Sequence, residues 1–320
     1  MRIGVIIVNY NSGALLRKCL EHVSRQTVSP SRVLVLDNAS HDGSLVGVEG
    51  ILPSLQVVRM DHNVGFAKAN NIAADMLADC DWIALLNPDA FPEKKWLQTL
   101  MRATVQYPAH DSFASKMLSE QDATIIDGAG DSYKVDGRVW PRFQGMPADV
   151  YGLKEEEVFS PCGGAALIRR RVFLDLGGFD VNYFCYHEDV DFGFRMRLRG
   201  CRCMYIPNAI VRHVGSASSG KGSDFSVYYA HRNMVWTYVK NMPGRYFWYY
   251  LPFHVFVNFA SIVLFVMRGR GKVILKAKTD ALKSLPVMLS QRRNVQLCRC
   301  VNAADIIRAM SPIKYPWRMN

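Results

Sequence analysis

Two kinds of hydrophobic pattern alternate along the first hundred residues of the chain. Continuous apolar runs at residues 3–8, 33–36 and 82–86 predict buried parallel strands, because strands covered on both faces lack polar alternation. Residues 56–59 predict a further, shorter strand. Apolar positions at helical spacing predict helices at residues 15–23, 65–77 and 93–105. Ser12 is the expected cap of the first helix. This alternation predicts an α/β fold, a mostly parallel sheet with helices on both faces.

Polar clusters follow three of these strands, at residues 9–12, 37–40 and 87–89. In open α/β sheets, ligands bind beyond the carboxyl ends of the strands, so we expect the site there. Residues 125–157 are rich in Gly, Asp and aromatic side chains and predict loops and short strands, where acceptor specificity often lies. Regular structure is expected again at residues 158–214.

The net charge of +11 is unevenly distributed along the 320 residues. Residues 231–320 contain 15 Lys and Arg but two acidic residues, a local charge of +13 that leaves residues 1–230 at −2. The composition, 49% hydrophobic and 21% charged, is that of a globular chain with one large domain and an appendage. The basic segment suits RNA, anionic lipid or solubility.

Residues 246–267 carry no charged side chain and approach the roughly 20 residues that span a bilayer. Pro252, His254 and Asn258 weaken a spanning helix, and basic residues flank both ends, against the positive-inside bias. We therefore expect an in-plane or re-entrant segment, with residues 272–293 against an anionic membrane surface. A spanning helix and a buried core helix are the alternatives. No nucleic acid partner is expected, because the aromatic residues do not interleave with the basic ones.

The eight cysteines include two C-x-C pairs without a nearby His pair at zinc spacing, which argues against a structural zinc site. The chain begins with a strand-like run rather than a basic and then apolar leader, so we expect no signal peptide. Free thiols then fit a reducing cytoplasm.

Two side chains are candidates for a metal site. Asp89 follows a buried strand and, with Asp37 nearby, suits Mg²⁺ or Mn²⁺, which take oxygen ligands and share them with phosphates. The alternative is an Asp that stabilises a strand-end turn. His213 follows a strand-like run and is either a structural residue or a further ligand.

Residues 187–195 hold Glu188, Asp189 and Asp191, three carboxylates that repel one another unless a cation or substrate uses them. At a helix start the dipole favours anions, and such a carboxylate can accept a proton from a hydroxyl. Asp191 and Arg195 are then positioned to pair. The alternative is an acidic helix start without a chemical role.

Two pairs of glycines accompany these motifs. Gly163 and Gly164 allow close approach of the backbone to a ligand but lack the spacing of a phosphate-binding loop. Gly177 and Gly178 are expected to end a helix.

Taken in order, these motifs resemble family 2 glycosyltransferases of the GT-A fold, over roughly residues 3–235. The matching segments are residues 5–11, 36–40, 63–71, 85–89, 163–164, 177–180, 187–191 and 212–213. Each segment alone is weakly specific, but the ordered set is highly specific and is most similar to rhamnosyltransferase-like members. The resemblance implies a GT-A domain at residues 1–235 and a helical membrane-associating region at 236–320.

The resemblance also implies roles for individual residues. Asp37 would bind the nucleobase or ribose, and the other donor-binding residues would be Asn9, Asn11, Asn63, Gly65, Asn70 and Asn87. Asp89 matches the last position of the family's D-x-D metal motif, whose first Asp is Asn87 here, and His213 matches a third ligand of Mg²⁺ or Mn²⁺. Asp189 matches the catalytic base and Glu188 an acceptor-side carboxylate, with Gly163, Gly164, Asp191 and Arg195 on the acceptor side.

The implied activity is inverting transfer of a sugar, first of all rhamnose, from a dTDP- or UDP-sugar to a lipid-linked or glycan acceptor. It would serve O-antigen, capsule or exopolysaccharide synthesis at the cytoplasmic face of the bacterial inner membrane, with peripheral or re-entrant attachment. A sugar nucleotidyltransferase is one alternative, but residues 9–13 lack a cation to hold a triphosphate. A catalytically inactive nucleotide-sugar or lipid-binding protein is another, but it should have lost Asp89 or Asp189.

Overall fold

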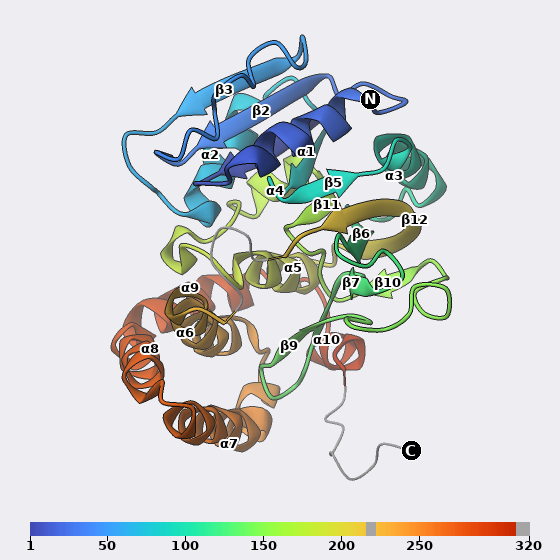
Figure 1. Cartoon of the computed structure of the whole chain (residues 1–320). Coiled ribbons are helices and arrows are strands. Elements are labelled where there is room, and N and C mark those ends of the chain that lie inside the picture. Colours follow the sequence, from blue (N-terminus) through green and yellow to red (C-terminus); the bar gives the residue numbers. More distant parts are fainter. Residues whose placement is uncertain (216–221, 312–320) are drawn as a thin grey trace.

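The computed structural model describes residues 1–215 and 222–311 (Figure 1). Its first half contains the four predicted parallel strands, in the order β4–β1–β2–β3. They are β1 (Ile3–Asn9), β2 (Arg32–Asp37), β3 (Leu55–Arg59) and β4 (Trp82–Leu86). The predicted helices are α1 (Ala14–Ser24), α2 (Phe66–Met76) and α3 (Trp96–Gln106). The prediction that Ser12 caps α1 is wrong, because Gly13 is the N-cap and no side chain caps the helix.

The second half extends the same sheet to the order β10–β12–β6–β11–β4–β1–β2–β3. Here β11 (Ala165–Arg169) runs antiparallel between β4 and β6 (Ser112–Ser119), whereas β12 (Cys203–His213) is parallel to β6. Three short strands pair with strands of this half of the sheet: β5 (Ala90–Pro92), β7 (Ile126–Gly128) and β10 (Glu156–Val158). A separate two-stranded sheet consists of β8 (Asp131–Tyr133) and β9 (Val139–Pro141). The α/β prediction is confirmed, as are the short strands of residues 125–157.

Two apolar cores explain why the strand sequences are uninterrupted. In β1, Val5 and Ile7 face a core shared with α1 and α3. Ile6 and Val8 face the opposite core, shared with α2, α4 (Arg170–Asp175) and α5 (Glu188–Leu198). Since successive strand residues point to opposite faces and both faces are covered, residues 3–8 of β1 carry no polar side chain.

The C-terminal part forms a helical layer on the far side of α5 from the sheet (Figure 1). It consists of α6 (Asp224–Asn241), α7 (Tyr246–Met267), α8 (Gly271–Lys283), α9 (Leu285–Leu297) and α10 (Ala303–Ala309). A third core joins this layer to the α/β part of the chain and contains Tyr133, Phe194, Trp236, Met288 and Ile306. The expected domain boundary after residue 235 lies within α6, and it stays a prediction.

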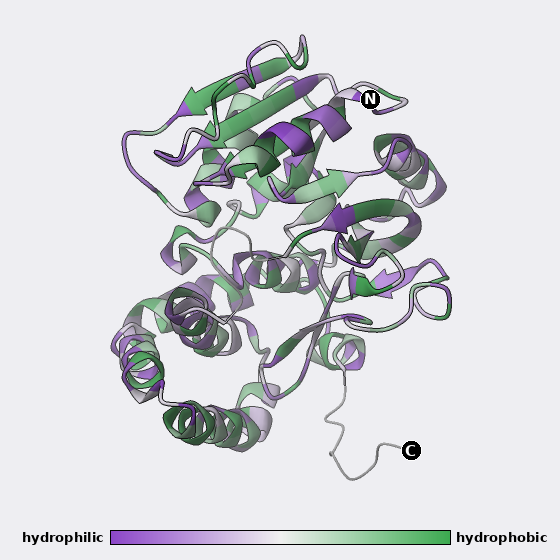
Figure 2. Ribbon diagram, in the orientation of Figure 1, coloured by the Kyte–Doolittle hydropathy of each residue, from purple (hydrophilic) through white to green (hydrophobic). Residues whose placement is uncertain are grey.

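The uncharged segment at 246–267 is the helix α7, and it is long and apolar enough to cross a membrane. Only 6% of its most apolar window is buried, which contradicts the alternative of a core helix. Figure 2 shows α7 as the dark green helix at the bottom of the molecule, the colour of hydrophobic residues.

Candidate active site

Asp89 and His213 meet because β5 pairs with the end of β12, in a register that aligns Ala90 with His213. The Nε2 atom of His213 lies 3.3 Å from Asp89 Oδ1, and its Nδ1 atom lies 2.7 Å from Asp127 Oδ2. The backbone N–H of Val214 donates to Asp89 O at 3.0 Å. The two residues that the sequence predicted as metal ligands are therefore neighbours, and Asp127 joins them.

The charges at this cluster suit a divalent cation. Burial lowers the pKa of His213, but hydrogen bonds to Asp127 and Asp89 outweigh it and raise the pKa to about 9. The protonated imidazole of His213 thus neutralises part of the negative charge of Asp89 and Asp127. A bound metal ion would take over this role, and its binding would release the proton. The Asp89 carboxylate and the His213 Nε2 atom are donors that suit Mn²⁺ or Mg²⁺, whereas Asp127 contacts the other ring nitrogen and would orient the imidazole. Sequence analysis missed Asp127, which lies in a region without periodicity.

The residues at the ends of β1 and β2 that the sequence predicted to bind a nucleotide-sugar donor form a network around Asp37. Asn9 Nδ2 donates to Asp37 Oδ1 at 2.7 Å, and the Ser40 N–H donates to Asp37 Oδ2 at 3.1 Å. Asn11 has a φ of +50° and accepts from the His41 N–H at 3.0 Å. Asn9 and Asp37 are buried. These contacts hold the Asp37 loop against the end of β1.

The other donor-side residues shape the start of α2. Asn63 Oδ1 accepts from the Gly65 N–H at 2.9 Å, and the buried Asn70 donates to Phe66 O at 2.9 Å. Gly65 has a φ of +85°, and a Cβ there would lie 2.5 Å from the Phe184 ring. Glycine is required because α2 begins against the segment that precedes α5.

Two hydrogen bonds from backbone N–H groups link the loop after β4, which carries Asn87 and Asp89, to the predicted base Asp189. The Asn87 N–H donates to Gly164 O at 2.9 Å, and the Gly163 N–H donates to Asp189 Oδ2 at 2.8 Å. A Cβ at Gly163 would lie 3.3 Å from Asp189 Oδ2. The glycine pair therefore brings the loop after β4 and the start of α5 close together.

Asp189 differs from the other acidic residues of α5 in its exposure. It is partly exposed, whereas Glu188 is 4% and Asp191 0% exposed. Burial raises the pKa of Asp189, although N–H bonds from Gly163 and Val190 oppose the shift. For Glu188, burial and then the charge of Asp189 raise the pKa well above its usual range. Asp189 therefore reaches solvent, and its carboxyl group ionises more easily than that of Glu188.

A further carboxyl group, Asp131 of β8, lies beside Asp189. Ligand atoms of Asp131, Cys162 and Asp189 lie within 4.8 Å of one another, close enough to share one cation. Burial and the charge of Asp189 raise the pKa of Asp131 well above its usual range. Sequence analysis missed this pairing, which no local spacing signals.

Asp191 and Arg195 form the predicted pair, with 2.8 Å between Oδ2 and Nε. Asp191 also contacts Lys240 Nζ at 3.0 Å and accepts from Asn241 Nδ2 at 2.8 Å. Burial raises the pKa of Asp191, but Lys240 and Arg195 lower it to about 2. These contacts fix α5 to α6, and the acceptor-side role of the pair stays a prediction.

The segment before α5 has a strained backbone. Phe184, Tyr186 and His187 have φ values of 66°, 66° and 67°. Such conformations cost of order 1–3 kcal/mol each and persist only where the surroundings impose them. The buried Asn233 of α6 imposes them here, because its Nδ2 donates to the carbonyl oxygens of Tyr183, Cys185 and Tyr186 at 3.0, 2.9 and 2.6 Å. Sequence analysis missed Asn233.

Comparison with known proteins identifies the family of the chain. A sequence model described as "Glycosyl transferase family 2" matches residues 4–177. An N-acetylglucosaminyl-diphospho-decaprenol L-rhamnosyltransferase of Mycobacterium tuberculosis is 28% identical over 238 residues, 68% of this chain and 77% of the relative. The O-antigen chain rhamnosyltransferase RfbN of Salmonella typhimurium is 26% identical over 217 residues, 67% and 66% of the two chains.

Among solved structures, the mannosyltransferase PcManGT of Pyrobaculum calidifontis, in complex with GDP-Man and Mn²⁺, has a TM-score of 0.53 and 17% identity. The match covers 96% of this chain and 87% of that one. This likeness concerns the fold, and it extends through the C-terminal helices.

Proposed function

This chain belongs to glycosyl transferase family 2 and is a glycosyltransferase. On that premise we propose that it transfers the sugar with inversion at the anomeric carbon, with Asp189 as the base and a divalent metal at Asp89. The observation that carries the proposal is the bridge from Asn87 through Gly164 and Gly163 to Asp189, at 2.9 and 2.8 Å. In-line displacement requires a base and a stabilised leaving group on opposite sides of one carbon. The bridge supports this arrangement, because it links the loop that carries Asn87 and Asp89 to the carboxylate of Asp189.

On the donor side, Asp89 and His213, with Asp127 beside them, would hold Mg²⁺ or Mn²⁺. The bound metal would neutralise charge on the departing diphosphate. Asp37 would hydrogen-bond the nucleoside, held in place by Asn9 and Asn11. Asn63, Gly65, Asn70 and Asn87 would form the walls of the same pocket.

On the acceptor side, Asp189 would take the proton of the attacking hydroxyl, with Glu188 next to it. The N–H groups of Gly163 and Val190 would orient the carboxylate, since each donates to one of its oxygens at 2.8 Å. Gly164 would line the acceptor path. We assign Asp191 and Arg195 to positioning this helix start, because Asp191 is fully buried.

For the substrates, we propose rhamnose on dTDP as donor, with a UDP-sugar as the alternative, and a lipid-linked or glycan acceptor. The names of the mycobacterial and Salmonella relatives support rhamnose and such an acceptor, since one is an N-acetylglucosaminyl-diphospho-decaprenol L-rhamnosyltransferase and the other an O-antigen chain rhamnosyltransferase. The product would be a cell-surface glycan such as O-antigen, capsule or exopolysaccharide.

We further propose attachment to the cytoplasmic face of the bacterial inner membrane, with residues 1–235 as catalytic domain and 236–320 as membrane-associating region. The exposed apolar surface of α7 and the +13 charge of residues 231–320 support contact with an anionic bilayer. Peripheral or re-entrant attachment fits a helix that packs on the protein along one side.

The test is hydrolysis and transfer of a panel of dTDP-, UDP- and GDP-sugars by the full chain, with Mn²⁺, Mg²⁺ or EDTA. We expect metal-dependent release of the nucleoside diphosphate and a thermal shift with the same donor. Stabilisation by a donor without turnover would instead indicate an inactive binding protein. Release of pyrophosphate from a nucleoside triphosphate and a sugar phosphate would indicate a nucleotidyltransferase.

A further inference from the structure

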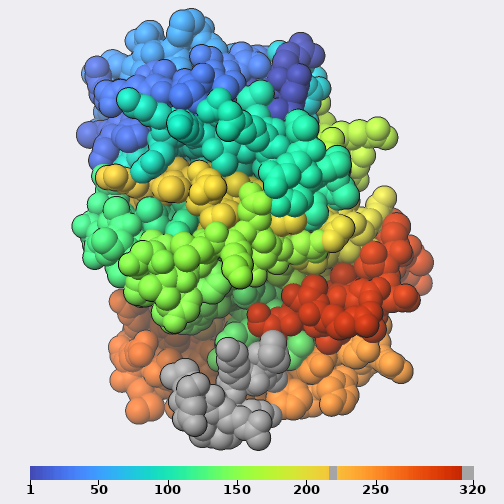
Figure 3. Space-filling model, turned by 90° about the vertical axis from the view of Figure 1, so that its right-hand side faces the viewer, coloured from blue at the N-terminus to red at the C-terminus, as the bar shows by residue number. Residues whose placement is uncertain are grey.

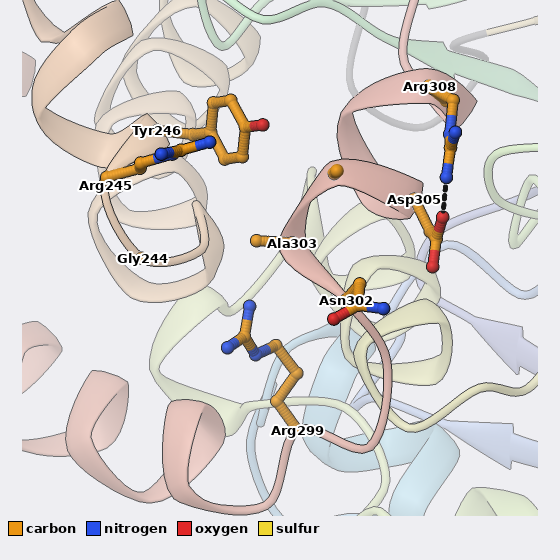
Figure 4. A pocket seen from close by; sticks show the side chains of 9 residues that line it. Gly244, Arg245, Tyr246, Arg299, Asn302, Ala303, Asp305 and Arg308 are labelled. Atoms are coloured by element: carbon orange, nitrogen blue, oxygen red, sulfur yellow. Dashed lines mark hydrogen bonds and ion pairs between the residues drawn. The ribbon is translucent and has the colours of Figure 1, made fainter.

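Two adjoining cavities lie on the helical layer, one between the start of α7 and α10 (Figure 4) and one between the segment before α7 and α9. Their volumes are about 470 and 400 Å³, and they share Gly244 and Arg299. Arginine dominates their lining, at positions 245, 292, 293, 299 and 308. The one carboxylate of the lining, Asp305, is paired with Arg308. The combined cavity, which we call the arginine pocket, therefore has a surplus of positive charge.

The arginines of the pocket differ in how they are bound. Arg292 donates to Val239 O and Met242 O at 2.9 and 2.6 Å and so supports the fold. Arg299 has a buried Nη1 atom with no hydrogen-bond partner among residues 1–215 and 222–311. Within those same residues, Arg245 and Arg293 form no ion pair. Arg245 and Arg293 therefore lack a carboxylate partner among the described residues, and an anion in the pocket would supply one.

Next to the pocket, α7 exposes one apolar face and packs its polar residues inward. Trp248 and Tyr249 are 71% and 68% exposed, one turn from Arg245. In contrast, His254 is buried with Nδ1 2.8 Å from Asp136 O, and Asn258 accepts from Lys278. The helix thus rests along the protein with an uncharged, aromatic-rich face outward. This is the arrangement of a helix that lies in the plane of a membrane surface.

We propose that the arginine pocket binds the phosphate headgroup of an anionic phospholipid while the exposed face of α7 enters the acyl region beside it. This inference rests on the proposed membrane attachment and names the site that reads the headgroup. Trp and Tyr near Arg245 match the order of groups across an interface, with cations at the phosphates and aromatic rings just below. Figure 3 shows the C-terminal segment (red) directly above residues of the helical layer (orange).

The position of the pocket favours a bilayer lipid over the diphosphate of a lipid-linked acceptor. Leu198, the last residue of α5, accepts a hydrogen bond from the Cys300 N–H at 2.9 Å. The pocket therefore lies beyond the C-terminal end of α5, and a helix of 11 residues is about 15 Å long. Asp189 is at the opposite end, and a base must lie within hydrogen-bond reach of the reacting hydroxyl.

The test is flotation of the full chain with phosphatidylcholine vesicles, with and without phosphatidylglycerol, at physiological and raised salt. The variant is Arg245→Gln with Arg299→Gln. The matched control is Lys272→Gln with Lys283→Gln, which removes the same charge from exposed positions of α8 outside the pocket. We expect the pocket variant to lose about tenfold or more of its partition into anionic vesicles, with the loss persisting at raised salt. The control should lose less, and salt should abolish its loss because exposed charges are screened.

Equal losses with equal salt dependence in the two variants would overturn the pocket, since attraction would then be a general effect of charge. Inorganic phosphate tests the other source of this chemistry. If phosphate alone raises the melting temperature of the wild type but not of the pocket variant, while both bind anionic vesicles equally, the lipid assignment is wrong. Vesicle binding needs no donor, so absence of donor hydrolysis in the wild type would refute the proposed function and leave the lipid result standing.

Discussion

Replacement of Asp189 by Asn is the most direct perturbation of the proposed mechanism. The substitution preserves size but removes the ability to accept a proton. Asp189 receives N–H groups on both oxygens, from Gly163 and from Val190 at 2.8 Å each. An amide has one acceptor oxygen, so one of these N–H groups will face an NH₂ group in the variant.

The expected loss of turnover follows from the worth of a general base, about a hundredfold to ten-thousandfold, or roughly 3–5 kcal/mol in the barrier. The stability should change much less. The lost hydrogen bond lowers the free energy of unfolding by about 1 kcal/mol. The substitution also removes a negative charge that burial disfavours, and this gain offsets the loss. Donor affinity should stay near the wild-type value, because the residues proposed to hold the donor lie on the other side of the glycine bridge.

The assay measures transfer rate, donor affinity and melting temperature for Asp189→Asn, Glu188→Gln and Asp191→Asn. Because burial keeps Glu188 protonated more readily than Asp189, Gln should replace it with little loss of rate. Asp191→Asn should instead unfold more easily, by about 3–5 kcal/mol, because it breaks the buried pairs with Lys240 and Arg195.

The reasoning is refuted if Asp189→Asn turns over normally. Loss of rate in Glu188→Gln alone would move the base by one residue. Full rate in all three variants would mean that the acidic start of α5 is structural.

Three further predictions concern residues around this centre. Asp89→Ala should abolish transfer and weaken Mn²⁺-dependent donor binding, measured by titration; unchanged donor affinity and rate would contradict the metal assignment. Asn233→Ala should lower the melting temperature and the rate, by about 1–3 kcal/mol in stability, because the carbonyls of Tyr183, Cys185 and Tyr186 in the strained segment lose their donor. A rate equal to wild type would show that the strain does not position Asp189. In EDTA, the Asp131→Asn variant should become more stable than the wild type as the pH rises above about 4. Burial raises the pKa of Asp131 in the folded state, so above that pH the folded wild type binds more protons than the unfolded chain and its free energy of unfolding falls with rising pH. A stability difference that stays constant with pH would contradict this.

The sequence alone was sufficient for the parallel half of the sheet and for the order of the motifs. Strands such as Ile3–Asn9 and Trp82–Leu86 are encoded by local apolar runs, since both faces of each strand are covered. The helix start at Glu188 and the pairing of Asp191 with Arg195 follow from spacing within one helix. The same local information identified α7 as an uncharged helix of near-membrane length.

The tertiary structure decided which side chains act together. Asp127 and Asp131 lie in segments without periodicity, and only the pairing of distant strands and loops places them beside His213 and Asp189. Asn233, on α6, donates hydrogen bonds to a loop some fifty residues earlier in the chain. Likewise, His254 and Asn258 counted against an apolar helix in the sequence, but packing turns both inward and leaves the outer face of α7 uncharged. Composition and periodicity report the environment of each residue along its own element, whereas a site depends on contacts between elements, which long-range packing alone determines.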